Sequence, residues 1–226
     1  LIVPSSHYYV PTASTYLVKY FTRKLNVKLA LNNCKPSDIG RIYRQYTYEN
    51  DYATMSVEDR NTNINNDIYY VDYNLWKDKF IIVLDDVRVT GAHERRALEL
   101  IQKAPIDIQF EYMFMYFVNV NGLSDPVIED RMNTHSMKGL KSIDYIIKNH
   151  GCLLNTRILK YILKCNFEEF FEFIQYQSEE FLSELLILAC GNNYHNNSVY
   201  ITNCKTLQNY ISCTFPVHKN KIQSIA

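Results

Sequence analysis

Several marks of common protein classes are missing from this sequence. It has no run of about 18 apolar residues that would span a bilayer, and its start lacks the charged-then-apolar pattern of a signal peptide. We therefore expect a cytoplasmic protein without a membrane partner. Lysine plus arginine and aspartate plus glutamate both number 24, so the net charge is zero and no long basic run indicates nucleic acid as a partner. Any phosphate site must then be local.

Cysteine spacing excludes two further classes. The six cysteines contain no CxxC pair, so they fit neither zinc-ligand spacing nor the disulfide framework of a small secreted domain, and we interpret them as reduced core thiols. What is present is 226 residues with 47% hydrophobic content, enough for a large domain with a real core. The chain begins at Leu1 inside an apolar run rather than with methionine, so we expect further residues before it in the gene product.

The first part of the chain combines two strand candidates with helical and polar stretches. Leu1–Val3 is typical of a short buried strand, and Ser14 is placed to cap a helix over about residues 15–26. Val27–Leu31 is a second strand candidate. A long polar excursion follows, with one helical stretch expected near Pro36–Gln45, and such an excursion inside a compact domain is usually functional or disordered.

Phe80–Leu84 begins a unit of strand, loop and helix. Five apolar residues in a row are typical of a strand buried on both faces of a parallel sheet. Thr90-Gly91 then makes a turn, and apolar residues from Ala97 onward continue at helical spacing. Ile106–Val120 is expected to return as an apolar, aromatic strand, so strands and helices alternate as in α/β proteins.

The last part of the chain has a helical pattern. Asn166 is expected to cap a phenylalanine-rich helix whose aromatic stripe serves packing rather than base stacking, and the next helix is expected to end at Gly191. We place a boundary here between an α/β core over residues 1–130 and a helical extension over residues 131–226. The extension contains no convergent set of catalytic residue types, so we expect it to pack on the core.

The loop Val89–Glu94 has the composition of a phosphate site. Backbone N–H groups that converge at a helix N-terminus hold phosphate esters well, and Gly91 lets the backbone approach the ligand closely. Asp85 and Asp86 precede the loop; carboxylates suit vicinal ribose hydroxyls as acceptors and, together with a diphosphate, commonly hold magnesium. The alternative is an ordinary turn, with Asp86 as a cap and Gly91 supplying only a positive φ.

Four apolar residues, two acids and a short run that ends in Thr-Gly resemble the phosphoribosyl-pyrophosphate motif of type I phosphoribosyltransferases. The wider string resembles a poorly characterised bacterial branch of that family, related to competence-associated members and carrying a helical C-terminal extension. The resemblance implies a parallel, doubly wound α/β sheet and transfer of the phosphoribosyl group with Mg2+ as cofactor. It implies that Asp85 and Asp86 face the ribose hydroxyls, serve catalysis and hold the metal. The substrate-binding loop residues that it implies are Arg88, Val89, Thr90, Gly91, Ala92 and His93.

The motif departs from the family pattern at two positions. Common members have threonine or serine where this chain has His93, so the last side-chain contact to the phosphate differs in kind. Hypoxanthine-guanine enzymes have an aspartate directly before the Thr-Gly pair, where this chain has Val89. A purine-salvage activity of that type is therefore disfavoured.

Two further loops carry expectations from the family. Ser5, Ser6 and His7 occupy the place of the loop that grips pyrophosphate, although the usual glycine and basic residue are missing there. The excursion that contains Arg60 occupies the place of a mobile catalytic loop, and we expect its cation to stabilise the departing diphosphate when the loop closes. Weaker candidates for this role are Arg41 and Arg44.

Two functions remain open on these grounds. One is an enzyme that displaces pyrophosphate from 5-phosphoribosyl-1-pyrophosphate by the nitrogen of an unidentified acceptor, a nucleobase or related molecule. The other is a regulatory module that binds phosphoribosyl pyrophosphate or a nucleotide without turnover. The first loop lacks the usual glycine and basic residue, and this favours the regulatory module. In both cases the partner is a small molecule, and a homodimer is one expectation for the assembly.

Overall fold

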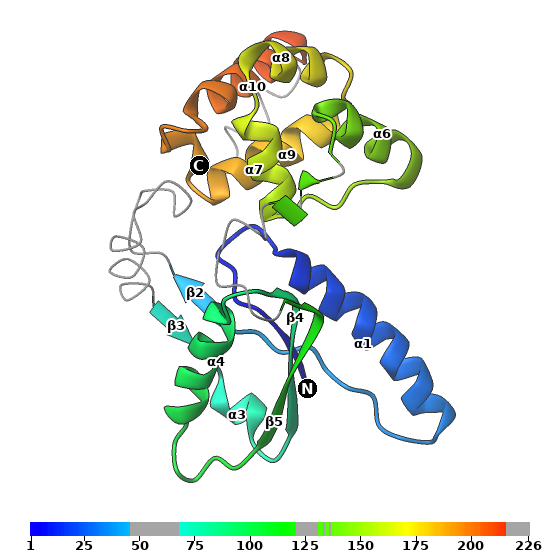
Figure 1. Ribbon diagram of the computed structural model, residues 1–226, viewed down its shortest axis with the longest axis vertical. Helices are drawn as coiled ribbons and strands as arrows, with labels where there is room; N and C mark the ends of the chain where they lie inside the picture. Colours follow the sequence, from blue (N-terminus) through cyan, green and yellow to red (C-terminus); the bar gives the residue numbers. More distant parts are fainter. Residues whose placement is uncertain (46–67, 121–130, 133, 136, 216–226) are drawn as a thin grey trace. The chain divides into compact units, whose positions relative to one another are not determined.

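The computed structural model describes residues 1–45, 68–120, 131–132, 134–135 and 137–215. These residues form two compact units that divide after His135 (Figure 1). The first unit is an α/β sheet structure and the second consists of helices. Within the described part of the chain, no helix is long and apolar enough to cross a membrane. The expected packing of the helical part on the α/β part stays a prediction.

The α/β unit is built on a parallel sheet of three strands in the order β1-β4-β5. The strands are β1 (Ile2–Pro4), β4 (Phe80–Arg88) and β5 (Glu111–Asn119). The expected central, buried strand at Phe80–Leu84 is confirmed, since β4 pairs with β1 on one side and with β5 on the other. It continues four residues further than the apolar run, so both aspartates of the motif lie inside the strand.

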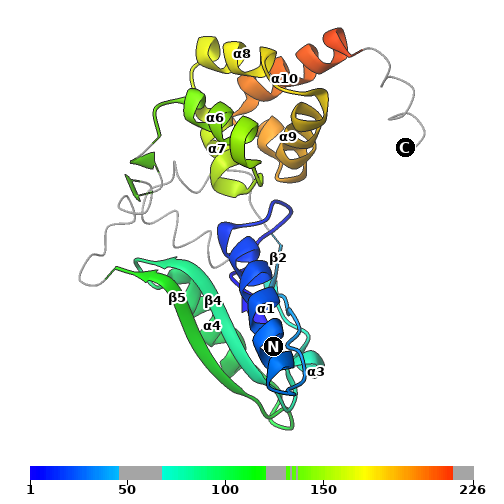
Figure 2. The same ribbon diagram turned by 90° about the vertical axis from the view of Figure 1, so that its right-hand side faces the viewer.

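Helices cover both faces of this sheet, as expected for a doubly wound α/β fold (Figure 2). Ile81 and Val83 of β4 face a core with α3 (Tyr73–Trp76) and α4 (Ala92–Gln102). Leu84 packs with residues of α1 (Ala13–Leu31) on the opposite face. Successive side chains of β4 therefore point to opposite faces of the sheet and pack into two separate cores. The same alternation determines the face to which each later residue of β4 points.

The expected strand at Val27–Leu31 is wrong, because this segment forms the last turns of α1. Its alternating apolar residues do not mark a buried face, since Val27 is 58% exposed and Leu31 is 79% exposed. Asn33 ends the helix with a φ of 56°, and the N–H of Cys34 donates to the carbonyl of Leu29 at 2.8 Å. An asparagine in the left-handed conformation is a helix stop signal that takes the place of the more usual glycine.

The expected helix near Pro36–Gln45 is also wrong. Its end forms β2 (Tyr43–Gln45), which pairs antiparallel with β3 (Ile68–Tyr70). Parallel stacking of the Tyr43 and Tyr70 rings, with centroids 4.6 Å apart, accompanies this pairing. Tyrosine favours strands when a cross-strand aromatic partner is available, and that partner lies far away in the sequence.

The helical unit confirms two boundaries expected from the sequence. The Asn166 side chain caps α8 by accepting from the N–H of Glu169, and α9 ends at Gly191. Phe170 is fully buried in this unit, whereas Phe167 and Phe171 are 48% and 39% exposed and stack on each other, so the aromatic stripe contributes to the core only in part. The elements of the unit are α6 (Leu140–His150), α7 (Thr156–Lys164), α8 (Phe167–Gln175), α9 (Glu179–Gly191), the short 3-10 helix η2 (Tyr194–Asn196) and α10 (Ile201–Thr214).

Candidate functional site

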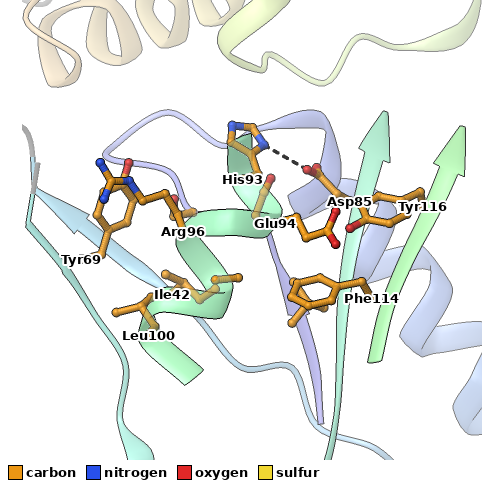
Figure 3. A pocket seen from close by; sticks show the side chains of 13 residues that line it. Ile42, Tyr69, Asp85, His93, Glu94, Arg96, Leu100, Phe114 and Tyr116 are labelled. Carbon is orange, nitrogen blue, oxygen red and sulfur yellow. Dashed lines mark hydrogen bonds and ion pairs between the residues drawn. The ribbon is translucent and has the colours of Figure 1, made fainter. Parts of the chain in front are cut away.

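At the carboxyl-terminal edge of the sheet, β1 ends beside the middle of β4, whose second half continues past it. Pro4 pairs with Leu84 in the parallel register, so the next residues, Ser5 and Asp85, are neighbours. Both are buried, and both line a small pocket together with His93 at the start of α4 (Figure 3). Open α/β sheets bind their ligands outside the carboxyl ends of the strands, and this edge therefore holds the candidate site.

Asp85 and His93 form a hydrogen-bonded pair at this edge. The Oδ2 atom of Asp85 lies 3.0 Å from Nδ1 of His93, and its Oδ1 atom accepts from the N–H of Asp86 at 3.0 Å. Burial by itself would raise the pKa of Asp85, but the hydrogen bond and charge of His93 and the contacts with Asp86 together lower it. We therefore treat Asp85 as an ionised carboxylate, with His93 as its main partner.

The two members of this pair differ sharply in exposure. The Asp85 side chain is 7% exposed, whereas the His93 side chain is 59% exposed. Asp86, the next residue of β4, is half-buried and thus more open to a ligand than Asp85. The two predicted carboxylates are adjacent in β4, but Asp85 is buried beside His93 whereas Asp86 is half-buried.

The loop between β4 and α4 has the geometry of an anion site. Gly91 adopts a left-handed conformation with a φ of 68° at the N-cap position, and no side chain caps the helix there. Val89 is buried and anchors the loop, while Thr90 is exposed. The first N–H groups of α4 therefore point away from the helix at a place where an anion could accept from them. Phosphate binding by residues 89–93 stays a prediction.

Arg88 is held by Glu94 across this loop. Its Nε donates to the Glu94 carboxylate, and its guanidinium lies over the Tyr116 ring, 5.8 Å from the centroid. Hydrogen bonding to Arg88 lowers the pKa of Glu94. The Tyr116 hydroxyl is buried beside Glu94 but outside hydrogen-bond geometry, and burial raises the pKa of this phenol.

Sequence reasoning missed the contribution of Tyr116 to this site. The residue lies opposite Asp85 in the register of β4 and β5 and lines the same pocket. No signal in its neighbourhood distinguishes it from the other aromatic residues of β5. It could have been found only from the strand register, which the sequence does not fix.

The loop after β1 is organised by hydroxyl groups rather than by a cation. Ser5 contacts Ser14 through their hydroxyls, and Ser14 also bonds to Thr12 at 2.9 Å. The N-cap position of α1 belongs to Thr12, so the expected cap at Ser14 is wrong; that hydroxyl turns back to Ser5 instead. His7 bonds to Thr15 at 3.2 Å through Nδ1. Burial and the nearby charge of Arg41 lower the pKa of His7 to about 4, so it is neutral at pH 7.

The expected cations of the site are placed only in part. Arg60 lies outside the described residues, as does the excursion around it. Arg41 is exposed; it lies over the Tyr43 ring and close enough to His7 to affect its pKa. Arg44 lies over the Tyr69 ring, 5.5 Å from its centroid. Among the residues that the structure describes, no three histidine, cysteine, aspartate or glutamate side chains gather as a metal cluster.

The sequence matches the model of a known family. A family model described as PRTase ComF-like matches residues 1–207 of the chain, which includes the whole α/β unit and most of the helical unit. No curated protein matches the sequence significantly.

Proposed function

Because the chain belongs to the ComF-like phosphoribosyltransferase family, we propose that it binds 5-phosphoribosyl-1-pyrophosphate with Mg2+ and transfers the phosphoribosyl group to a nitrogen nucleophile. The observation that carries the proposal is the uncapped N-terminus of α4. Its N-cap residue, Gly91, follows within three residues of the end of β4, the strand that bears the two acids. A phosphate ester bound there would place the attached ribose beside these acids. The fold and the family support such an activity without identifying the acceptor.

Each part of the site has a role in this reaction. The N–H groups of residues 91–93 would donate to the 5-phosphate, with the Thr90 hydroxyl at the rim. The exposed side of the acid pair, at Asp86, would accept from the ribose hydroxyls. As the bond from C1 to the diphosphate oxygen breaks, the nitrogen forms a bond to C1 and loses its proton to water. Positioning and stabilisation of the separating charges account for the catalysis.

Magnesium would take most of its ligands from the substrate. No protein cluster of three or more ligating side chains occurs in the described part of the chain, and Mg2+ commonly combines one or two carboxylates with substrate phosphates. The ion would supply charge neutralisation for the leaving diphosphate, and Asp86 is the more accessible carboxylate to contact it. Ligation by both acids stays a prediction.

The departing diphosphate would meet the loop after β1. Ser5, Ser6 and the neutral His7 offer hydroxyl and imidazole groups there, and Arg41 lies close enough to His7 to lower its pKa. We propose that Arg60 adds positive charge when the excursion closes over the site. In that case Arg60→Ala lowers turnover far more than affinity, because the contact forms mainly in the transition state.

A regulatory module that binds the same ligand without turnover is the second candidate. Two observations favour it: residues 5–14 contain no lysine or arginine, and two arginines beside the phosphate loop are already engaged, Arg88 with the Glu94 carboxylate and Arg95 with the Thr90 carbonyl. A site short of positive charge binds a diphosphate but stabilises its departure poorly.

Release of pyrophosphate separates the two candidates. The purified protein is incubated with phosphoribosyl pyrophosphate and Mg2+, with and without a panel of nucleobases and simple amines, and released pyrophosphate is measured. Release that depends on one acceptor supports the transferase. Saturable binding without release for any acceptor in the panel supports the regulatory module. Arg88→Lys and Asp86→Asn in parallel show whether any release originates at this site.

A further inference from the structure

Asp85 is the less accessible of the two acids that the resemblance assigns to the ribose hydroxyls. Asp85 is 5% exposed as a residue, and both of its carboxylate oxygens accept hydrogen bonds from other parts of the chain. Such a side chain has little surface left for a ligand. Its position is better suited to holding another protein group in place.

The group that it holds is His93. An ionised carboxylate can only accept, so the 3.0 Å contact to Oδ2 requires that Nδ1 of His93 carries a hydrogen. The contact fixes the tautomer of the ring and its direction. Nε2 is then the ring nitrogen that does not face Asp85, and the His93 side chain is 59% exposed at the first turn of α4 (Figure 3).

The location of His93 decides what Nε2 can meet. The residue belongs to the uncapped first turn of α4, two positions after the N-cap Gly91. A protonated imidazolium carries hydrogen on both nitrogens, so it could donate to the Asp85 carboxylate and to a phosphate oxygen at once. Hydrogen bonds between charged groups are about twice as strong as neutral ones.

We propose that Asp85 is the positioning residue of His93 and that the oriented imidazole makes the side-chain contact to the 5-phosphate, in place of a hydroxyl. This inference rests on the proposed binding of phosphoribosyl pyrophosphate at this edge. It leaves Asp86 as the acid that serves the ribose hydroxyls. The loop thus binds the phosphate ester through His93, which is held in place by Asp85; the pair connects β4 and α4.

A double-mutant cycle tests whether Asp85 acts through His93. The variants are Asp85→Asn, His93→Thr and the double variant, and the probe is ribose 5-phosphate, titrated by calorimetry. In the wild-type background, Asp85→Asn is expected to weaken binding about tenfold, the size of one lost charged hydrogen bond. In the His93→Thr background the same change is expected to alter binding less than about twofold, because threonine needs no orienting carboxylate.

Asp86→Asn is the matched control, because it changes the neighbouring acid and should weaken binding equally in both backgrounds. If Asp85→Asn is also equally costly in both, Asp85 is a direct ligand and the inference is wrong while the proposed function stands. If the wild-type protein binds neither ribose 5-phosphate nor phosphoribosyl pyrophosphate, the proposed function and the inference fall together.

A second measurement needs no change at Asp85. The ring nitrogens of His93 are observed by 15N NMR in the wild-type protein, with His93→Gln for assignment. The inference requires hydrogen on Nδ1 throughout, and a shift of the Nε2 resonance on addition of ribose 5-phosphate. A neutral ring with hydrogen on Nε2 alone would overturn it.

Discussion

Arg88 and Glu94 close the phosphate loop from its two ends: the last residue of β4 donates through its guanidinium to a carboxylate in the first turn of α4. The loop between them contains Gly91, whose added Cβ would lie 3.3 Å from the Arg88 guanidinium. The pair therefore holds together the strand, the loop and the helix that form the candidate phosphate site.

Replacing Glu94 by glutamine is expected to loosen the loop without unfolding the protein. Both side chains are partly exposed, 34% and 24%, so the loss in free energy of unfolding should stay below about 1 kcal/mol. Amide hydrogen exchange at residues 89–93 is expected to become faster. Glu99→Gln is the control, since the Glu99 side chain is 48% exposed and pairs with Arg96 within the same helix. Equal protection of the loop in both variants would show that the Arg88–Glu94 pair does not order it.

Gly91→Ala is expected to damage ligand binding beyond its effect on stability. A non-glycine residue in the left-handed region costs roughly 1 kcal/mol, and the new methyl group would also crowd Arg88 at the phosphate loop. Gly151→Ala provides the control, because Gly151 also has a positive φ, 70°, with nothing within 4 Å of an added Cβ. Its ψ of 145° lies outside the left-handed region and suits glycine alone, so we expect the loss of stability in urea unfolding to be at least as large as in Gly91→Ala. Loss of phosphoribosyl-pyrophosphate binding is expected only in Gly91→Ala. Loss of binding in the control as well would contradict a local role.

Acid is expected to destabilise the α/β unit through His7. The pKa of His7 is lowered to about 4 by burial and by Arg41, against about 6.5 in an unfolded chain. Between these values the unfolded state binds a proton that the folded state does not, so stability falls as pH falls from about 6.5 to 4. Urea unfolding at several pH values should show a smaller loss in His7→Asn than in the wild type. Parallel curves for the two proteins would mean that His7 titrates normally.

Glu169 is expected to stabilise the helical unit from a distance in sequence. Its carboxylate accepts from the N–H of Leu140 at 2.6 Å, at the start of α6, where the N-cap Gly139 has no side chain to do so. Glu169→Ala should therefore cost about 1 kcal/mol, comparable to loss of a capping residue. Glu168→Ala removes an exposed first-turn acid of the same helix and is the control. Hydrogen exchange at the start of α6 should rise only in the Glu169 variant.

A truncated protein can test whether the helical extension packs on the α/β core. A chain that ends near Arg131 is expected to expose apolar surface and aggregate, if the helical part packs on the α/β part. Light scattering and heteronuclear NMR spectra of the shortened protein measure this. A soluble and fully folded α/β unit would instead make the helical part an independent module.

How much the sequence predicts depends on the range of the interactions involved. The strand, loop and helix from Phe80 to Gln102 follow from local signals: an apolar run, a glycine with positive φ and a helical period. Val27–Leu31 was misinterpreted because alternation in five residues is compatible with the end of a helix whose residues are exposed. Tyr43–Gln45 became a strand through a partner more than twenty residues away, which no local window contains.

The candidate site shows the same division. Residues 85–93 could be identified from their order along the chain, whereas the pairing of Asp85 with His93 depends on how α4 leaves the sheet. Tyr116 enters only through the register of β5 against β4. The residues of a site on one continuous segment can thus be identified from the sequence, whereas the contacts that their side chains make in the fold cannot.

Calorimetric titration with phosphoribosyl pyrophosphate and Mg2+ directly measures whether this ligand binds at the carboxyl end of β4. We expect saturable binding to the wild-type protein and affinity at least about tenfold weaker in Asp86→Asn, because hydrogen bonds to a charged group contribute about 1.5–3 kcal/mol. Both proteins should give the same thermal unfolding profile, which confirms that the variant is folded. Absence of binding to the wild type, or equal affinity in the two proteins, would contradict a ribose-phosphate site at the carboxyl end of β4.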